Sequence, residues 1–484
     1  MKCSTLDMVK YSTGDVSTSL TLNSLFGFAM VYYTQALGLS PVWAGLAMGL
    51  ATFWEAVSDP IMGYITDITR SKHGRYHPYM FIGGITMMLV FFFLWKVPAF
   101  FLVTKVLLFC YLVVMNLLLR TLFTVFFIPY TALGFEICTD YDGRSKLQGI
   151  RLAMNMLANL LGPALSWTIF FSQTPQQKAA GIEPNSIAAN YVNMGTGFTA
   201  AGLLFVLYCC IATYKYKQDS RNLQTGSTGI AGFFKEMLGI LKDKNARSVY
   251  LFLFIALVGV AMVSVFQMFC YIHFLACTAF MKTLIHGSSM VGMGIGGLIS
   301  QYMVRFLSKR GAIVVAVIWN VSCNVILAIL YLPGIIEPQA ICRIYSFDVP
   351  YGFGIFMFFH AAFWVSNGVL LATSAAMIAD VSEINLLKTN INKDGSYSSV
   401  LCFVNKLAIS VAIFIAGFVL SGIGIEGHTG SGTYAKDTIW RLGAVTVLSG
   451  PIVSIFALLP VWSYPITREY LKNAREEAAC VKCK

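Results

Sequence analysis

The sequence predicts an all-α membrane protein with twelve transmembrane helices in two six-helix bundles, and two observations carry that prediction. Of the 484 residues, 57% are apolar and only 12% are charged, whereas a soluble chain carries about 25% charged residues. Apolar stretches of spanning length also recur along the whole chain, with one long polar interruption near its middle. Too few polar side chains remain to cover a globular surface in water. The composition therefore excludes a soluble enzyme and a nucleic-acid-binding domain, despite a net charge of +12.

The order of the apolar stretches gives the domain organisation. A helix needs about 20 apolar residues to cross the hydrocarbon core of a bilayer. The candidate helices are 16–38, 42–65, 78–96, 104–134, 147–171 and 191–214, then 248–276, 285–306, 312–332, 350–379, 399–424 and 440–464. The expected parts are an N-terminal bundle over 1–214, a cytoplasmic central loop over 215–247, a C-terminal bundle over 248–464 and a cytoplasmic tail over 465–484. Two such bundles are the layout of the major facilitator superfamily.

Lysine and arginine are unevenly distributed between alternate loops. Of the 34 such residues, 25 lie on the side that holds both termini, seven on the other side, and two, Arg120 and Lys406, within expected spans. Because cytoplasmic loops carry the excess of positive charge, we expect both termini in the cytoplasm. The apolar stretch after Met1–Ser12 continues at spanning length, so no cleavable signal peptide is expected. We expect a multi-pass monomer in the plasma (inner) membrane, with the lipid bilayer as its surroundings.

The remaining motifs give no sign of an enzyme. We find no Ser/His/Asp cluster, metal-ligand spacing or phosphate loop, and no resident cofactor is expected. Most of the twelve cysteines lie in apolar stretches and act as small hydrophobes. Cys480 and Cys483 lack a second ligand pair, so we interpret them as tail residues. The central loop contains a short amphipathic piece around Phe233–Leu241, which we interpret as part of the tether between the bundles.

The second expected helix carries two acids inside the membrane. Glu55 and Asp59 are one turn apart, so both carboxylates share a face, with Ser58 beside them. Pro60 leaves the carbonyl four residues earlier without its helical partner, which adds an oxygen. Clustered oxygens suit Na⁺, and two adjacent carboxylates can share one proton. The pattern predicts a cation site for Na⁺ or H⁺; the alternative is a pair of acids neutralised by a basic partner.

Arg120 and Lys406 are the candidates for that basic partner. Arg120 lies in the middle of the fourth expected helix, and Lys406 near the start of the eleventh. The helical stripe of Arg120 also carries two hydroxyls and an aromatic ring, those of Thr124, Thr131 and Phe127. Because arginine pairs bidentately with planar oxyanions, this stripe suits an anionic, hydroxylated ligand. The alternative is that Arg120 only pairs with an acid of the second helix.

Other aromatic and polar residues inside the spans are candidates for contact with a sugar. Aromatic faces suit sugar rings, although such side chains in membrane helices more often pack or anchor at the interface. The candidates among them for substrate binding are Tyr33, His360 and Trp364.

The run from Glu55 to Pro78 closely resembles the signature of helices 2 and 3 in the glycoside–pentoside–hexuronide:cation symporters, the melibiose-permease-like family of the major facilitator superfamily. Four further stretches agree in order. The first is Gly14-Asp15 with Tyr33-Thr34, the second Ile128-Pro129-Tyr130, and the third Arg144 with Leu147 and Arg151. The fourth contains Ala379-Asp380, Glu383, Lys388-Thr389, Gly395 and Asn405-Lys406-Leu407. The resemblance covers nearly the whole chain.

The resemblance implies sodium- or proton-coupled sugar uptake by alternating access. In the family the paired acids of helix 2 form the cation site with a threonine that aligns with Thr124, and the lysine that aligns with Lys406 couples cation to sugar. Charged cytoplasmic residues are thought to close the inward gate through ion pairs. Here those are Asp67, Arg70, Arg75, Arg144, Arg151, Asp380 and Glu383.

Several residues depart from the family's pattern. Glu55 replaces the usual Asp and Ser58 the usual Asn, which leaves Na⁺ and H⁺ both open as the coupling ion. Ser19 and Phe127 stand where two acids of the melibiose permeases hold a galactoside's hydroxyls, which argues against a galactoside bound in that manner. The loop after the tenth helix carries Ile384-Asn385-Leu386 instead of Tyr-Gly-Glu, which predicts a weaker gate.

The loss of two pocket acids beside Arg120 shifts the local charge from negative towards positive. The sequence therefore favours an acidic sugar, such as a uronate, an oligouronide or a sulfonated sugar. Three alternatives stay open. They are a neutral glycoside or pentoside with Arg120 as a structural counter-ion, a lysolipid of the kind that animal relatives of the fold carry, and a membrane sensor that binds sugar without moving it.

Overall fold

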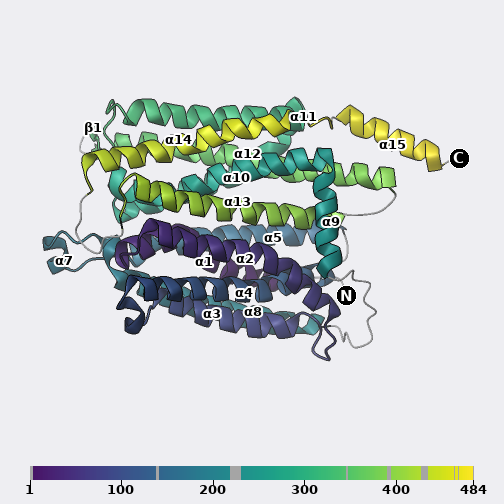
Figure 1. Cartoon of the computed structure of the whole chain (residues 1–484), viewed down its shortest axis with the longest axis horizontal. Helices are drawn as coiled ribbons and strands as arrows, with labels where there is room; N and C mark the ends of the chain where they lie inside the picture. The colour runs from purple at the N-terminus through teal and green to yellow at the C-terminus, as the bar shows by residue number, and fades with distance from the viewer. Residues whose placement is uncertain are drawn as a thin grey trace. The chain divides into compact units, whose positions relative to one another are not determined.

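A computed structural model describes residues 4–137, 141–217, 230–344, 347–389, 394–426, 434–462, 464–466 and 468–482 (Figure 1). The chain divides into two compact units. Unit 1 comprises Met1–Ile230, Thr278–Thr283 and Ile413–Tyr434, and unit 2 comprises Ala231–Cys277, Leu284–Ala412 and Ala435–Lys484. Apart from one hairpin, the regular structure in the described ranges is helical, as expected.

The helices of unit 1 carry the predicted cation site. In order they are α1 (Thr5–Ser24) with its π-helical continuations η1 (Leu25–Ala29) and η2 (Tyr32–Ala36), α2 (Pro41–Ile68), α3 (His77–Trp95), η3 (Ala99–Leu102), α4 (Lys105–Ile137), α5 (Tyr141–Asn159), η4 (Leu160–Ala164), α6 (Leu165–Ile169), α7 (Pro175–Ala179), η5 (Pro184–Ser186), α8 (Ala188–Thr213) and η6 (Tyr214–Tyr216). The start of α2 is specified locally, because the Ser40 side chain accepts a hydrogen bond from the Trp43 N–H and Pro41 occupies the first turn.

The remaining elements contain the rest of the long helices. They are α9 (Ile230–Lys242), α10 (Lys244–Phe269) with η7 (Cys270–Phe274), α11 (Ala279–Tyr331), α12 (Tyr351–Thr389), α13 (Asp394–Gly422), α14 (Lys436–Val461) and α15 (Arg468–Lys482). α9 is the amphipathic piece expected in the central loop. Two features were not predicted: the tail is helical in α15, and β1 (Cys342–Ile344) pairs antiparallel with β2 (Phe347–Val349).

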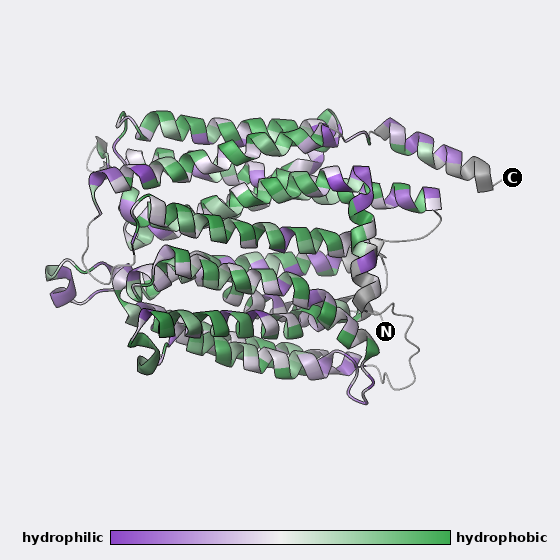
Figure 2. Ribbon diagram, in the orientation of Figure 1, coloured by the Kyte–Doolittle hydropathy of each residue, from purple (hydrophilic) through white to green (hydrophobic). Residues whose placement is uncertain are grey.

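Eight described helices are long and apolar enough to cross a membrane. One of them, α11, holds two of the predicted spans, which meet at Ser308, where the backbone turns out of the helix with φ 65°. The three predicted spans outside this set correspond to α1, α2 and α5, and these helices carry buried or half-buried charges such as Asp15, Glu55 and Arg151. The apolar faces of the long helices and the hydrophilic residues near many helix ends are visible in Figure 2.

Several helices begin before the predicted spans because hydropathy detects only the apolar part of a helix. α1 starts at Thr5, ahead of the expected 16, and its first turn is tied to η6 by an ion pair of 2.6 Å between Asp7 and Lys215. The hydrogen bond from Lys215 lowers the pKa of the Asp7 carboxyl to about 2, so this pair is ionised at physiological pH.

Small residues allow α11 and α12 to pack closely in unit 2. A Cβ at Gly296 would collide with the Val365 carbonyl, and one at Gly368 with the Met293 carbonyl. In contrast, a Cβ at Gly294 would meet nothing within 4 Å. Membrane helices associate mainly through such close packing, so these two glycines fix the distance between the helices.

This packing predicts different effects for two neighbouring substitutions. We expect Gly296→Ala to destabilise the protein by about 1–3 kcal/mol, because the new methyl group would collide with the backbone of α12, which cannot move aside as a flexible side chain could. Gly294→Ala is the matched control and should leave the melting temperature in detergent unchanged or raise it slightly, since alanine is the better helix former. Equal losses in both variants would contradict this account of the α11–α12 contact.

Candidate cation and substrate site

The centre of unit 1 holds a buried ion pair between α2 and α4. Arg120 Nη1 lies 2.6 Å from Glu55 Oε2, and only 5% of Arg120 and 2% of Glu55 are exposed. The guanidinium carbon also lies 5.6 Å from the centre of the Phe26 ring. A charge inside a membrane protein is costly unless it is paired, so each of these residues stabilises the other in place.

The second acid lies beside this pair in a cluster of oxygen atoms. Thr124 Oγ1 donates to Asp59 Oδ1 at 2.7 Å and lies 3.2 Å from Ser58 Oγ. Ser58 Oγ in turn donates to the Glu55 carbonyl at 3.3 Å. Pro60 lies inside α2 and has no N–H to donate to the carbonyl one turn earlier. Carboxylate, hydroxyl and carbonyl oxygens are the ligands that hard cations prefer.

The charges of this cluster are unequal. Glu55 and Asp59 carry two negative charges when ionised, and Arg120 carries one positive charge that it does not lose. One Na⁺ or one H⁺ would bring the three residues to neutrality. Taken by themselves, these three residues have a net charge and oxygen atoms that suit a monovalent cation.

The other predicted substrate residues of unit 1 lie on α4, α1 and η2 and make contacts outside this cluster. Phe127 stacks on Phe123 with ring centres 5.1 Å apart. The Thr131 hydroxyl donates to the Ile128 carbonyl at 2.9 Å. On α1, the Ser19 hydroxyl donates a hydrogen bond to the Asn155 carbonyl at 3.0 Å. On η2, the fully buried Tyr33 hydroxyl accepts a hydrogen bond from the Asn116 amide at 3.0 Å.

Unit 2 brings two predicted residues into a buried polar cluster on α10, η7 and α12. His360 Nε2 lies 2.8 Å from the Tyr271 hydroxyl and 3.1 Å from Gln267 Oε1, and it accepts from the Trp364 indole N–H at 3.2 Å. Each of these four residues is at most 5% exposed. On α11, His286 is 6% exposed, and neither of its ring nitrogens has a hydrogen-bond partner in the part of the chain that the structure describes.

The sequence analysis missed Tyr271 and His286. A single tyrosine or histidine in an apolar helix has no partner at a diagnostic spacing, so no local pattern marks it. The one available signal is that Tyr271 lies in the π-helical turn η7, and such turns are frequent at functional sites.

The predicted gate residues form two buried or half-buried pairs, each within one unit. Arg151 reaches the two carboxylate oxygens of Asp15 at 2.8 and 3.0 Å, and Tyr130 donates to the same carboxylate at 2.6 Å. In unit 2, Lys309 pairs with Asp380 at 2.6 Å. Asp15 and Lys309 were not predicted as partners. Each pair holds helices of its own unit together.

The other gate predictions lie at helix ends or along helices. The Arg75 guanidinium carbon lies 4.8 Å from the centre of the Tyr76 ring. Arg70 follows α2, Glu383 lies in α12, and Lys406, the predicted coupling residue, lies in α13. The side chains of Asp67 and Arg144, like those of Cys480 and Cys483, lie outside the described part of the structure.

Comparison with known proteins gives the family. The model of the family described as "MFS/sugar transport protein" matches residues 10–468. This chain belongs to that family. The expected resemblance and the major facilitator fold are thereby confirmed, and the protein is a multi-pass membrane transporter and not an enzyme.

Individual relatives are distant. An uncharacterized symporter of Synechocystis is 23% identical over 96% of this chain and 95% of its own length. A putative glycoside/cation symporter of Escherichia coli is 28% identical over 32% of this chain and 33% of its own. The sodium-dependent lysophosphatidylcholine symporter 1-B of Danio rerio is 22% identical over 96% and 88%. Among solved structures, the nucleoside transporter NupG shares the fold with a TM-score of 0.61 and 12% identity over 96% of this chain and all of its own.

The buried pair predicts how the transporter responds to loss of charge. Arg120→Gln should lower the stability by about 3–5 kcal/mol, because it leaves Glu55 buried and uncompensated. The double variant Glu55→Gln, Arg120→Gln should recover most of that loss, because it removes the uncompensated Glu55 charge and returns the net charge of the cluster to that of the wild type. The measurement is thermal unfolding of the purified protein in detergent, with Arg441→Gln, half-exposed on α14, as the control. A double variant no more stable than Arg120→Gln would contradict the pairing.

Proposed function

We propose that this transporter is a cation-coupled symporter that imports an acidic sugar by alternating access. The observation that carries the proposal is the buried Arg120–Glu55 pair beside Asp59. In this state the guanidinium is engaged by Glu55. A cation or proton that neutralises the acids weakens that attachment and makes Arg120 available to a second anion, the carboxylate or sulfonate of the sugar.

This exchange of partners supplies coupling. Substrate binds well only when the cation site is occupied, and by linkage the substrate must then raise the affinity for the cation by the same factor. Counted over Glu55, Asp59 and Arg120, the empty carrier and the carrier that holds one cation and one anionic substrate have the same net charge, so both can change between outward- and inward-facing states. A carrier with only the cation or only the substrate differs from this charge by one unit and does not.

Different residues take different parts in the proposed mechanism. Glu55, Ser58, Asp59 and Thr124 hold the coupling ion, Na⁺ or H⁺, and Lys406 contributes to coupling as the family resemblance implies. Contacts with the substrate come from Ser19, Tyr33, Arg120, Phe127, Thr131, His360 and Trp364. In unit 2, His360 and Trp364 lie in the cluster with Gln267 and Tyr271, which has the hydroxyl, amide and ring groups that recognise a sugar.

The proposed cycle also uses the charged cytoplasmic residues and a fixed orientation. The Arg151–Asp15 pair stiffens unit 1 and the Lys309–Asp380 pair stiffens unit 2, and the other predicted gate residues take part in closing the inward gate. Both termini lie in the cytoplasm, as the distribution of lysine and arginine predicts.

A lysophospholipid is the second candidate substrate. Phe127, which stacks on Phe123, replaces an acid of the sugar carriers with an aromatic surface on the Arg120 stripe. A phosphate with an acyl chain would use the same guanidinium and this surface. A relative that spans most of this chain is a lysophosphatidylcholine symporter.

The substrate class is tested with matched ligand pairs. Thermal stabilisation of the purified protein is measured with glucose and glucuronate, galactose and galacturonate, and a lysophospholipid, each in Na⁺ and in choline. We expect the uronates to raise the melting temperature and the neutral sugars not to, and the shift to vanish in Arg120→Ala. Stabilisation by the neutral sugars alone would make Arg120 a structural counter-ion, and stabilisation by the lysophospholipid alone would identify the second candidate.

The coupling role of the second acid is tested by transport. Asp59→Cys should abolish gradient-driven accumulation while downhill exchange survives, because Glu55 and Arg120 then balance each other and leave no second acid for a cation to neutralise. Asp437→Cys is the control, since Asp437 is an exposed acid of α14 paired with Arg441. Both variants are reconstituted in liposomes and assayed with labelled substrate. Accumulation by Asp59→Cys at the wild-type level would exclude this carboxylate as the coupling group.

A further inference from the structure

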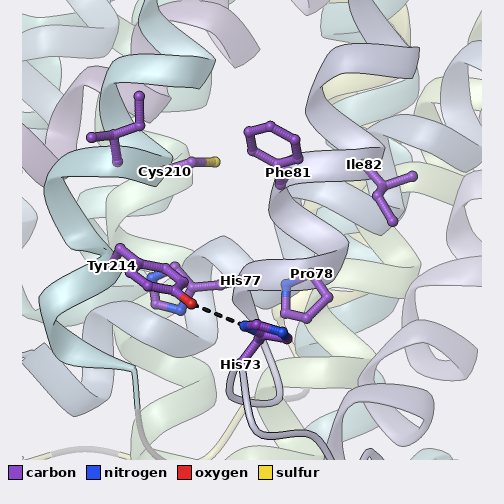
Figure 3. A pocket seen from close by; sticks show the side chains of 8 residues that line it. His73, His77, Pro78, Phe81, Ile82, Cys210 and Tyr214 are labelled. Atoms are coloured by element: carbon purple, nitrogen blue, oxygen red, sulfur yellow. Dashed lines mark hydrogen bonds between the residues drawn. The ribbon is translucent and has the colours of Figure 1, made fainter.

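Unit 1 has a groove on its outer side, between α3 and α8, that the transport cycle described above does not use. Its volume is about 420 Å³, within the usual range of about 300–1,000 Å³ for sites that bind small molecules. It is lined by His73, His77, Pro78, Phe81, Ile82, Cys210, Ile211 and Tyr214. Figure 3 shows His73, His77 and Tyr214 grouped at one end, with Phe81, Ile82 and Cys210 farther along the two helices.

The long wall of the groove is apolar and open to the outside of the protein. Ile82 is 62% exposed, Ile211 71% and Phe81 46%. Both α3 and α8 are long and apolar enough to cross a membrane. Exposed side chains on such helices face hydrocarbon, so the wall suits an acyl chain.

The other end of the groove is polar and basic. The Tyr214 hydroxyl lies 3.0 Å from His73 Nδ1 and 3.1 Å from Lys217 Nζ, and the Lys217 ammonium lies over the Tyr214 ring. None of the eight lining residues is an acid. Asp7, which contacts the same segment, is engaged by Lys215 and Tyr216. The Lys217 charge is therefore not cancelled by this acid.

The backbone adds to this positive end. α3 begins at His77, and no side chain caps its N-terminus. The partial positive charge of a helix N-terminus favours an anion, and here it lies next to the His73–Tyr214–Lys217 cluster. Two independent features, a helix end and a basic side-chain cluster, thus point to negative charge at one end of an apolar groove.

We propose that this groove binds a phospholipid with an anionic headgroup, its phosphate at His73, Tyr214 and Lys217 and one acyl chain along Phe81, Ile82 and Ile211. Basic pockets between membrane helices on the cytoplasmic side recognise such headgroups. The proposal places this end at the cytoplasmic leaflet, as the count of lysine and arginine predicts. A soluble phosphate would leave the apolar wall uncovered, and an apolar helix would leave the basic cluster unused, so the lipid is the occupant that fits both ends.

A bound lipid would act on the turn that links the cation-site helix to α3. His73 lies in residues 69–76, directly between α2, which carries Glu55 and Asp59, and α3. A headgroup held by His73 and by Lys217 would tie this turn to the end of α8. The site is thus distinct from the substrate site but joined to it through α2.

The test is native mass spectrometry of the delipidated full-length protein titrated with phosphatidylglycerol or phosphatidylcholine of identical acyl chains. We expect one phosphatidylglycerol to bind more tightly than phosphatidylcholine. The double variant His73→Ala, Lys217→Ala should weaken phosphatidylglycerol about tenfold and phosphatidylcholine less, because the choline ammonium already offsets the charge of its phosphate. Ile82→Trp should weaken both lipids by filling the groove.

Two controls and a second measurement keep the result decisive. Lys146→Ala removes an exposed charge that lies at the same end of unit 1, where its ammonium contacts Thr5, and Leu204→Trp enlarges an exposed residue of α8 outside the groove. Neither should change binding.

A photoactivatable phosphatidylglycerol should label peptides of α3 and α8. Equal binding of both lipids, an unchanged double variant, or an equal loss in Lys146→Ala would overturn the proposal, as would binding of glycerol phosphate as tight as that of the lipid.

Discussion

A charge buried inside a membrane protein must have a partner, and the Arg120–Glu55 pair is where this constraint governs the structure. The two residues hold α2 and α4 together through an ion pair in which Arg120 Nη1 lies 2.6 Å from Glu55 Oε2. Asp59 lies beside this pair, where it accepts a hydrogen bond from Thr124. Stability and coupling thus use the same atoms, and any ligand that binds Arg120 must compete with Glu55. In the proposed mechanism, the neighbouring oxygens of Ser58 and Thr124 help to hold the monovalent cation.

The same constraint explains the arrangement of the other charges. Arg151 meets Asp15 through two hydrogen bonds, and Lys309 meets Asp380, so in each unit a basic side chain is held against an acid. Where helices meet without charges, as at Gly296 and Gly368, close backbone packing takes over. An ion pair can exchange one partner for another, whereas a close backbone contact at a glycine cannot. The protein therefore has both switchable and rigid contacts.

The fold and the closeness of the two acids of α2 were accessible from the sequence because both have periodic signatures. Apolar windows located the spans, and the one-turn spacing of Glu55 and Asp59 put them on one face. The pairing of Arg120 with Glu55 was one of two open interpretations, because a sequence does not show which side of α4 meets α2. Asp15 as the partner of Arg151, and Tyr271 and His286 near His360, were missed because their partners lie on other helices with no fixed spacing. The groove beside Tyr214 was missed for the same reason.

The central claim is that occupation of the acids releases Arg120 to the substrate. The measurement that tests it most directly is the affinity for glucuronate by calorimetry as a function of Na⁺ concentration and of pH. It is made on the wild type and on the double variant Glu55→Gln, Arg120→Gln. The account predicts that wild-type affinity rises with the coupling cation and that the double variant binds weakly with no cation dependence. A double variant whose glucuronate affinity still rises with the cation would contradict it.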